Sequence, residues 1–173
     1  YIWNLAQTTA LINIIKTIHP EIIIILGGPE VSFLTGTEPV AIPADYIICG
    51  EADLEFYKLC REILQGENPP GKIIKPSAPD LAQLQSPYPF YTDEDIANRV
   101  IYVEASRGCP FGCEFCLSSL PVPVRQAPLE PLLRDLRKLL DRGAKQLKFV
   151  DRTFNLDPEF SSAILTFCLE NYK

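Results

Sequence analysis

Two apolar runs, each ending in a glycine turn, most restrict the folds that this chain can adopt. Residues 21–26 read EIIIIL and lead into a Gly-Gly-Pro turn, while residues 45–49 read DYIIC and lead into a Gly-Glu turn. Such β-branched runs are typical of strands in a parallel sheet that is covered on both faces. Apolar residues at helical spacing precede the first run and follow the second, over residues 5–18 and 54–64.

This alternation of strand, glycine turn and helix predicts a doubly wound α/β sheet. In such sheets ligands bind outside the carboxyl ends of the strands. Both glycine turns follow the carboxyl end of an expected strand. They are therefore candidate ligand loops.

The second half of the chain predicts a different α/β unit. Residues 66–98 are rich in proline and are expected to be a linker; a strand over 99–105, a helix over 129–141, a strand over 146–150 and a helix from 157 follow. Two strands cannot close a barrel, so this order predicts the opening part of one. We expect the domains to span residues 1–65 and 99–173. The chain contains no methionine and begins within an expected helix, so we also expect an internal fragment of a longer protein.

Three of the six cysteines lie within the stretch RGCPFGCEFC, at Cys109, Cys113 and Cys116. This C-x3-C-x2-C spacing gathers three thiols in one loop. Structural zinc usually takes four protein ligands, and the single histidine, His19, lies far away in the sequence. An iron–sulfur cluster also normally takes four cysteines, so three would leave one iron without a protein ligand. An open metal position, where a cofactor or substrate can bind, is favoured over structural zinc, which stays the alternative.

Composition restricts the class of partner. The net charge of −6 and the isoelectric point near 4.8 argue against a broad basic face, so nucleic acid is not an expected partner. The longest apolar run is too short to span a bilayer, and no signal segment opens the chain, so we expect no membrane contact and a cytoplasmic protein. Clustered cysteines in such a protein indicate metal or redox use rather than disulfides.

The stretch VEASRGCPFGCEFC resembles the first strand–loop–helix unit of radical S-adenosylmethionine (radical SAM) enzymes. The resemblance implies that Cys109, Cys113 and Cys116 bind a 4Fe-4S cluster, whose unique iron is chelated by the amino and carboxylate groups of S-adenosylmethionine (SAM). It also implies that Phe115 lies beside the adenine of SAM. Reductive cleavage of SAM would need a low-potential electron donor such as flavodoxin or ferredoxin.

The stretches EIIIILGGPEVSF and DYIICGEADLEF resemble the cobalamin-binding subfamily of these enzymes. The implied fold is the C-terminal part of a Rossmann-like, flavodoxin-like cobalamin-binding domain, joined to the first βαβα portion of a partial TIM barrel. Glycine lets a bulky ligand approach the backbone, although a Gly-Gly turn also occurs without any ligand. The sequence has no D-x-H-x-x-G motif, so the lower axial ligand of cobalamin stays open. The implied cobalamin contacts are Gly27, Gly28, Pro29, Gly50 and Glu51.

Three polar residues follow the strand expected at 146–150, where barrel enzymes assemble their sites: Asp151, Thr153 and Asn155. A contact to SAM or substrate and a purely structural role are both open, since Asp151 could cap the turn and Asn155 could begin the next helix. Asp151 is the candidate catalytic residue. The Gly-Gly-Glu stretch that many radical SAM enzymes carry near this point is absent from the sequence.

The resemblance implies a radical SAM enzyme that cleaves SAM reductively and then performs cobalamin-dependent methyl transfer or a rearrangement on an unknown substrate. Two alternatives stay open: a radical SAM enzyme without bound cobalamin, and a noncatalytic zinc or iron–sulfur module. These residues alone are not expected to turn over, because the later barrel strands are not among them.

Overall fold

The computed structural model describes residues 3–32, 42–116 and 123–171. The chain divides into two compact units, Tyr1–Pro79 and Asp80–Lys173, which are described separately below. The expected stretch EIIIILGGPEVSF ends on a residue outside the described ranges, as do the last two residues of the final expected helix.

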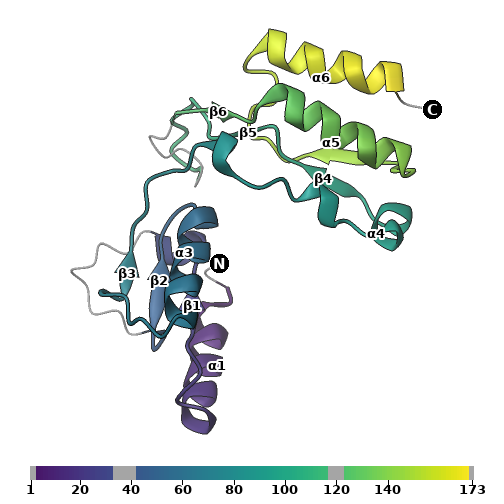
Figure 1. The fold of residues 1–173 in the computed structure, drawn as a ribbon. Coiled ribbons are helices and arrows are strands. Elements are labelled where there is room, and N and C mark those ends of the chain that lie inside the picture. Colours follow the sequence, from purple (N-terminus) through teal and green to yellow (C-terminus); the bar gives the residue numbers. More distant parts are fainter. Residues whose placement is uncertain (1–2, 33–41, 117–122, 172–173) are drawn as a thin grey trace. The chain divides into compact units, whose positions relative to one another are not determined.

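The first unit is a three-stranded parallel sheet with helices on both faces. In the sheet order β1-β2-β3, Ile25 pairs with Tyr46 and Ile47 pairs with Ile73 (Figure 1). The sequence-based prediction of parallel strands alternating with helices is thus confirmed. The elements, in chain order, are α1 (Leu5–Ile18), β1 (Ile25–Leu26), α2 (Pro29–Ser32), β2 (Tyr46–Ile48), α3 (Asp53–Leu64) and β3 (Ile73–Ile74).

The central strand β2 explains how this sheet is covered on both faces. Its side chains alternate in direction, so Ile47 joins a cluster with Ile12 of α1 and Val31 of α2, while Ile48 joins a second cluster with Leu59 of α3. All three residues of β2 are buried. Burying apolar side chains on both faces is the main favourable term for a sheet of this kind.

Two details of this unit differ from the prediction. β1 covers only the end of the run at residues 21–26, and Ile22 and Ile23 are partly exposed, because within the described residues β1 pairs with β2 alone and has no second neighbour. β3 lies in the segment expected to be a linker. Two residues are too few to show an alternating apolar pattern, so only the pairing with β2 identifies β3 as a strand.

The second unit contains a parallel pair of strands and a short antiparallel pair. β4 (Ile101–Val103) pairs in parallel with β7 (Leu147–Phe149), and β5 (Ser106–Arg107) pairs antiparallel with β6 (Arg125–Gln126). The remaining elements are the 3-10 turns η1 (Leu81–Gln83) and η2 (Tyr88–Phe90) and the helices α4 (Asp93–Asn98), α5 (Leu129–Asp141) and α6 (Pro158–Asn171).

The core of the second unit lies between the parallel strands and two helices. Ile101 and Val103 of β4 are completely buried with Leu136 of α5 and Ile164 of α6. Figure 1 shows α5 and α6 on one side of this strand pair. The order β-loop-α-β-α agrees with the sequence-based expectation, and Gly143 follows the end of α5 with a φ of 92°, as expected for a helix-ending glycine.

The helices are short relative to a bilayer. Within the described residues, no helix is both long and apolar enough to cross a membrane.

Candidate functional site: the cysteine loop

The predicted metal ligands lie on a loop that follows the short strand β5, which comes soon after the carboxyl end of β4. We call residues 108–116 the cysteine loop. Its entry is fixed by the pairing of β5 with β6, in which Ser106 lies opposite Gln126 and Arg107 lies opposite Arg125. The carboxyl ends of parallel strands are where α/β proteins place their sites, so the loop starts where a functional loop is expected.

The first residue of the cysteine loop must be glycine. Gly108 has a φ of 101°, and a Cβ added to it would lie 3.1 Å from the carbonyl oxygen of Pro123 and 3.2 Å from the Cα of Val124. L-residues rarely adopt that φ, and a Cβ would crowd the backbone opposite, which would have to shift by a few tenths of an ångström. Gly108 therefore turns the chain sharply from β5 into Cys109.

The carboxylate of Asp151 accepts two hydrogen bonds from residues just before the cysteine loop. Its Oδ2 accepts the backbone N–H of Ala105 at 3.1 Å, and its Oδ1 accepts the hydroxyl of Ser106 at 2.6 Å. Asp151 follows β7, so this carboxylate joins the ends of two strands. The prediction that Asp151 is catalytic is not tested by this arrangement, which engages both of its oxygens.

Glu104, between β4 and β5, is held from two other directions. Its backbone N–H donates to the hydroxyl of Tyr88 at 3.0 Å, and its carboxylate pairs with the Nε of Arg107 at 2.8 Å. Burial of Tyr88 raises the pKa of its phenol, which keeps the hydroxyl protonated. The Arg107 side chain is therefore engaged by Glu104 within its own segment.

The three thiols differ in exposure. Cys113 is exposed, whereas Cys109 and Cys116 are partly buried, and all six cysteines, which fall within the described ranges, form no disulfide. A turn brings Cys113 and Cys116 together, since the N–H of Cys116 donates to the carbonyl of Cys113 at 3.1 Å. Phe115, between them, is 94% exposed.

Across the described ranges, no group of three or more His, Cys, Asp or Glu side chains is gathered as a metal site would need. The donor set itself fits a cluster with one open iron, because three cysteine sulfurs outside any disulfide lie in one loop. The type and number of these side chains therefore match a cluster with one open iron.

The other cysteines behave as small apolar side chains. Cys49 is buried and Cys168 is partly buried, and burial raises the pKa of both thiols. A raised pKa keeps a thiol protonated and unreactive. His19 is the C-cap of α1, and its Nδ1 lies 3.0 Å from Oε1 of Glu21 on the surface.

The two glycine turns of the first unit follow neighbouring strands and are joined by one side chain. The hydroxyl of Ser32, at the end of α2, donates to the carbonyl of Gly28 at 2.7 Å and accepts the N–H of Gly50 at 2.8 Å. Gly28 and Gly50 have φ values of 106° and 74°, and a Cβ on either would meet nothing within 4 Å. The backbone conformation requires glycine at both positions, and the space beside them is open. The sequence analysis did not identify Ser32.

The remaining turn residues have simple places in the fold. Pro29 begins α2, which suits proline at a first helical position. Glu51 follows Gly50 and is partly buried.

The polar residues after β7 divide by role. Thr153 has a buried hydroxyl without a hydrogen-bond partner among the described residues, and Asn155 is exposed. The last helix begins directly after Asp157, as predicted, and the alternative start at Asn155 is not what the structure shows: the Oδ1 of Asp157 accepts the N–H groups of Glu159 and Phe160, each at 3.1 Å. Asp157 is better placed because its carboxylate reaches the first free N–H groups of α6.

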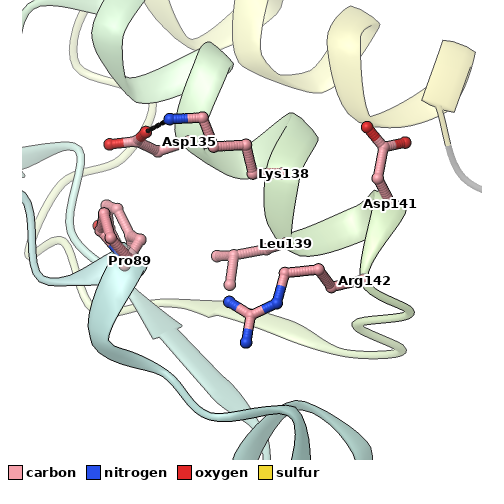
Figure 2. A pocket seen from close by; sticks show the side chains of 7 residues that line it. Pro89, Asp135, Lys138, Leu139, Asp141 and Arg142 are labelled. Atoms are coloured by element: carbon pink, nitrogen blue, oxygen red, sulfur yellow. Dashed lines mark hydrogen bonds and ion pairs between the residues drawn. The ribbon is translucent and has the colours of Figure 1, made fainter.

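A cavity of about 400 Å³ lies between η2 and α5, and no residue of the cysteine loop lines it (Figure 2). Its charged side chains are largely neutralised by neighbours: Lys138 pairs with Asp135 at 3.2 Å and Arg142 pairs with Asp93 at 2.7 Å. No predicted site residue is among those that line it, which are Tyr88, Pro89, Asp135, Lys138, Leu139, Asp141 and Arg142.

Comparison with known proteins gives a consistent class of relatives, although no protein-family model matches the sequence. The chain is 32% identical over 171 residues to an uncharacterized methyltransferase of Pyrococcus horikoshii, covering 84% of the chain and 36% of the relative. It is 26% identical to the cobalamin-dependent radical SAM methyltransferase TokK of Streptomyces tokunonensis, covering 91% of the chain and 27% of the relative.

A solved structure supports the fold. The radical SAM methyltransferase TsrM from Kitasatospora setae, solved with a tryptophan substrate and a SAM analogue, matches 96% of the chain with a TM-score of 0.68 at 14% identity, over 36% of its own length. The chain spans about a third of these proteins. The chain thus has a mixed α/β fold with parallel sheets similar to TsrM, and its relatives are methyltransferases that include cobalamin-dependent radical SAM enzymes.

Proposed function

We propose that the chain forms part of a radical SAM methyltransferase in which Cys109, Cys113 and Cys116 hold a 4Fe-4S cluster. The observation that carries the proposal is their C-x3-C-x2-C spacing on a loop fastened to the carboxyl end of a parallel strand. Three thiolates leave one iron of such a cluster open to SAM. When bound, the cluster supplies the electron that cleaves SAM.

The chain's own residues prepare this loop. Gly108 turns the backbone out of β5, while Tyr88 and Asp151 fix the residues before it through their hydrogen bonds. Phe115, exposed between two of the ligands, is proposed to contact the adenine of SAM. An aromatic face next to an adenine contributes stacking, and its exposure leaves that face accessible.

Methyl transfer is favoured over rearrangement because the relatives are methyltransferases. We propose that residues 1–65 bind cobalamin and residues 99–173 bind SAM, and that the segment 66–98 between them adds β3 to the first unit and η2 and α4 to the second. The glycine turns at the ends of β1 and β2 support this assignment, since they are adjacent and open. Gly27, Gly28, Pro29, Gly50 and Glu51 would contact the nucleotide tail of cobalamin. A flavodoxin or ferredoxin would reduce the cluster.

The cluster assignment is tested by anaerobic reconstitution of the chain with iron and sulfide. The wild type should bind about four iron and four sulfide per chain. Cys113→Ala should lose most of both. Cys60→Ala is the control, because it removes a thiol from α3 outside the cysteine loop and should load like the wild type.

Each contrary result identifies a different error. Full iron and sulfide in Cys113→Ala would contradict the ligand assignment. Zinc without sulfide in the purified wild type would favour a noncatalytic metal-binding module. Cobalamin is tested separately by its visible spectrum after mixing and gel filtration, and a chain that retains none would leave a radical SAM enzyme without cobalamin.

A further inference from the structure

We propose that Asp151 is a positioning residue for the cysteine loop, and that its carboxylate sets the geometry in which the three thiols meet iron. The inference rests on the proposed function and deepens it. It gives Asp151 no contact with a reacting atom. Its effect on the cluster passes through the backbone of Ala105 and the side chain of Ser106.

The register of the parallel strands places Asp151 beside Ala105. Val103 of β4 pairs with Phe149 of β7, and the backbone ladder ends with the N–H of Val150 donating to the carbonyl of Val103 at 2.9 Å. Two residues beyond the paired positions, the Asp151 side chain accepts the N–H of Ala105. A carboxylate therefore continues the connection between the strands where their backbones separate.

Ala105 is the point at which the two sheets of this unit meet. Its N–H faces Asp151, and its carbonyl accepts the N–H of Ala127, just after β6, at 2.8 Å. Ala105 has no exposed surface. A buried N–H without an acceptor is strongly unfavourable, so without Asp151 the backbone at Ala105 would have to move.

Two donors explain why the residue is an aspartate. The Ala105 N–H and the Ser106 hydroxyl approach different oxygens of the carboxylate. A carboxylate accepts both hydrogen bonds with its charge, whereas the neutral amide of asparagine would accept only the Ala105 N–H and would have to donate to the Ser106 hydroxyl, so both contacts would be weaker. Ser106 is 8% exposed, so water does not readily compensate for the weaker contacts.

The distance along the chain from this contact to the ligands is short. Ser106 precedes Arg107, Gly108 and then Cys109, and both Ser106 and Arg107 are paired with β6. A displacement at Ser106 is thus transmitted to Cys109. The direction in which the first thiol leaves the strand depends on Asp151.

The experiment compares the wild type with Asp151→Asn, Ser106→Ala and Ile164→Val. The last variant removes one methylene from the core of the same unit and touches none of these hydrogen bonds, so it controls for loss of stability alone. Amide exchange of Ala105 and Ala127 is measured by NMR on the metal-free chain. Iron, sulfide and the reduction potential are measured after anaerobic reconstitution.

In Asp151→Asn we expect the Ala105 amide to exchange about tenfold faster, together with reduced loading and a shifted potential in the molecules that do load. Ser106→Ala should show the same changes to a smaller degree. Ile164→Val should keep the wild-type potential. If Asp151→Asn does not fold, Ser106→Ala decides by the same criteria.

The outcomes separate this inference from the proposed function. If the wild type binds iron and sulfide, and both Asp151→Asn and Ser106→Ala keep its loading and potential, the positioning role is overturned and the cluster assignment is left intact. A wild type that binds no iron and sulfide overturns both. An equal shift of potential in Ile164→Val would assign the effect to stability and likewise overturn the positioning role.

Discussion

Gly108 lies against Pro123 so closely that a Cβ on Gly108 would come within 3.1 Å of the Pro123 carbonyl oxygen. Gly108→Ala adds this contact and places a side chain at a φ of 101°. We expect the second unit to lose about 1–3 kcal/mol in its free energy of unfolding, from the left-handed backbone and the crowding together. Urea midpoints read from hydrogen-exchange peptides of residues 80–116 measure the loss.

Gly112→Ala is the matched control for this prediction. Gly112 lies in the same cysteine loop, but a Cβ there meets nothing within 4 Å and its φ is not positive. The control should stay within about 0.5 kcal/mol of the wild type. Equal effects of the two substitutions would contradict the account of Gly108.

The contrast between Gly108 and Cys109 illustrates what could be predicted from the sequence. The spacing of the three cysteines identifies the candidate ligands directly, because the chemistry is carried by neighbours along the chain. The role of Gly108 depends on Pro123, which is 15 positions away in the sequence and lies beside it where β5 pairs with β6. No local pattern in the sequence reveals that contact.

The same distinction applies to the strands and to Asp151. β1 and β2 could be predicted because long β-branched runs precede glycine turns, whereas β3, β5 and β6 are two residues each and are defined by their partners. Asp151 could be placed at the end of a strand, but Ala105 and Ser106 lie 46 and 45 positions before it. Partners that distant follow from strand register rather than from composition.

Ser32 links the two glycine turns, and its removal should loosen them together. Ser32→Ala deprives the Gly50 N–H of its acceptor and the Gly28 carbonyl of its donor. Because the site is partly open to water, we expect a cost of about 0.5–1.5 kcal/mol, seen as roughly fivefold faster exchange of the Gly50 amide. NMR-detected hydrogen exchange on the full chain measures this rate.

Ser32→Thr keeps the hydroxyl and is the control for the loss of serine itself. It should preserve slow exchange at Gly50. If Ser32→Ala exchanged at the wild-type rate, the hydroxyl would not connect the turns in solution, and joint binding of one ligand by both turns would lose its structural support.

Asp157 makes the start of α6 sensitive to acid. The hydrogen bond from the Gln126 side chain, at 3.0 Å, is the main cause that lowers the pKa of Asp157 below the ordinary value of 3.8, followed by the N–H of Phe160. A carboxyl whose pKa is lowered on folding stabilises the protein fully above its unfolded pKa. This contribution is lost as the pH falls through the folded pKa.

Asp157→Asn removes this titration while its amide oxygen still accepts the helix N–H groups. The wild type should therefore be more stable than the variant near pH 6, and the difference should shrink steadily as the pH falls below about 4. Urea midpoints for peptides of α6, followed by pulsed hydrogen exchange between about pH 2 and pH 6, measure the difference. In a Gln126→Ala background the pH-dependent part should be smaller, because the main cause of the lowered pKa is gone. A difference in stability that stayed constant with pH, or grew toward acid, would show that folding does not favour the ionised form of Asp157.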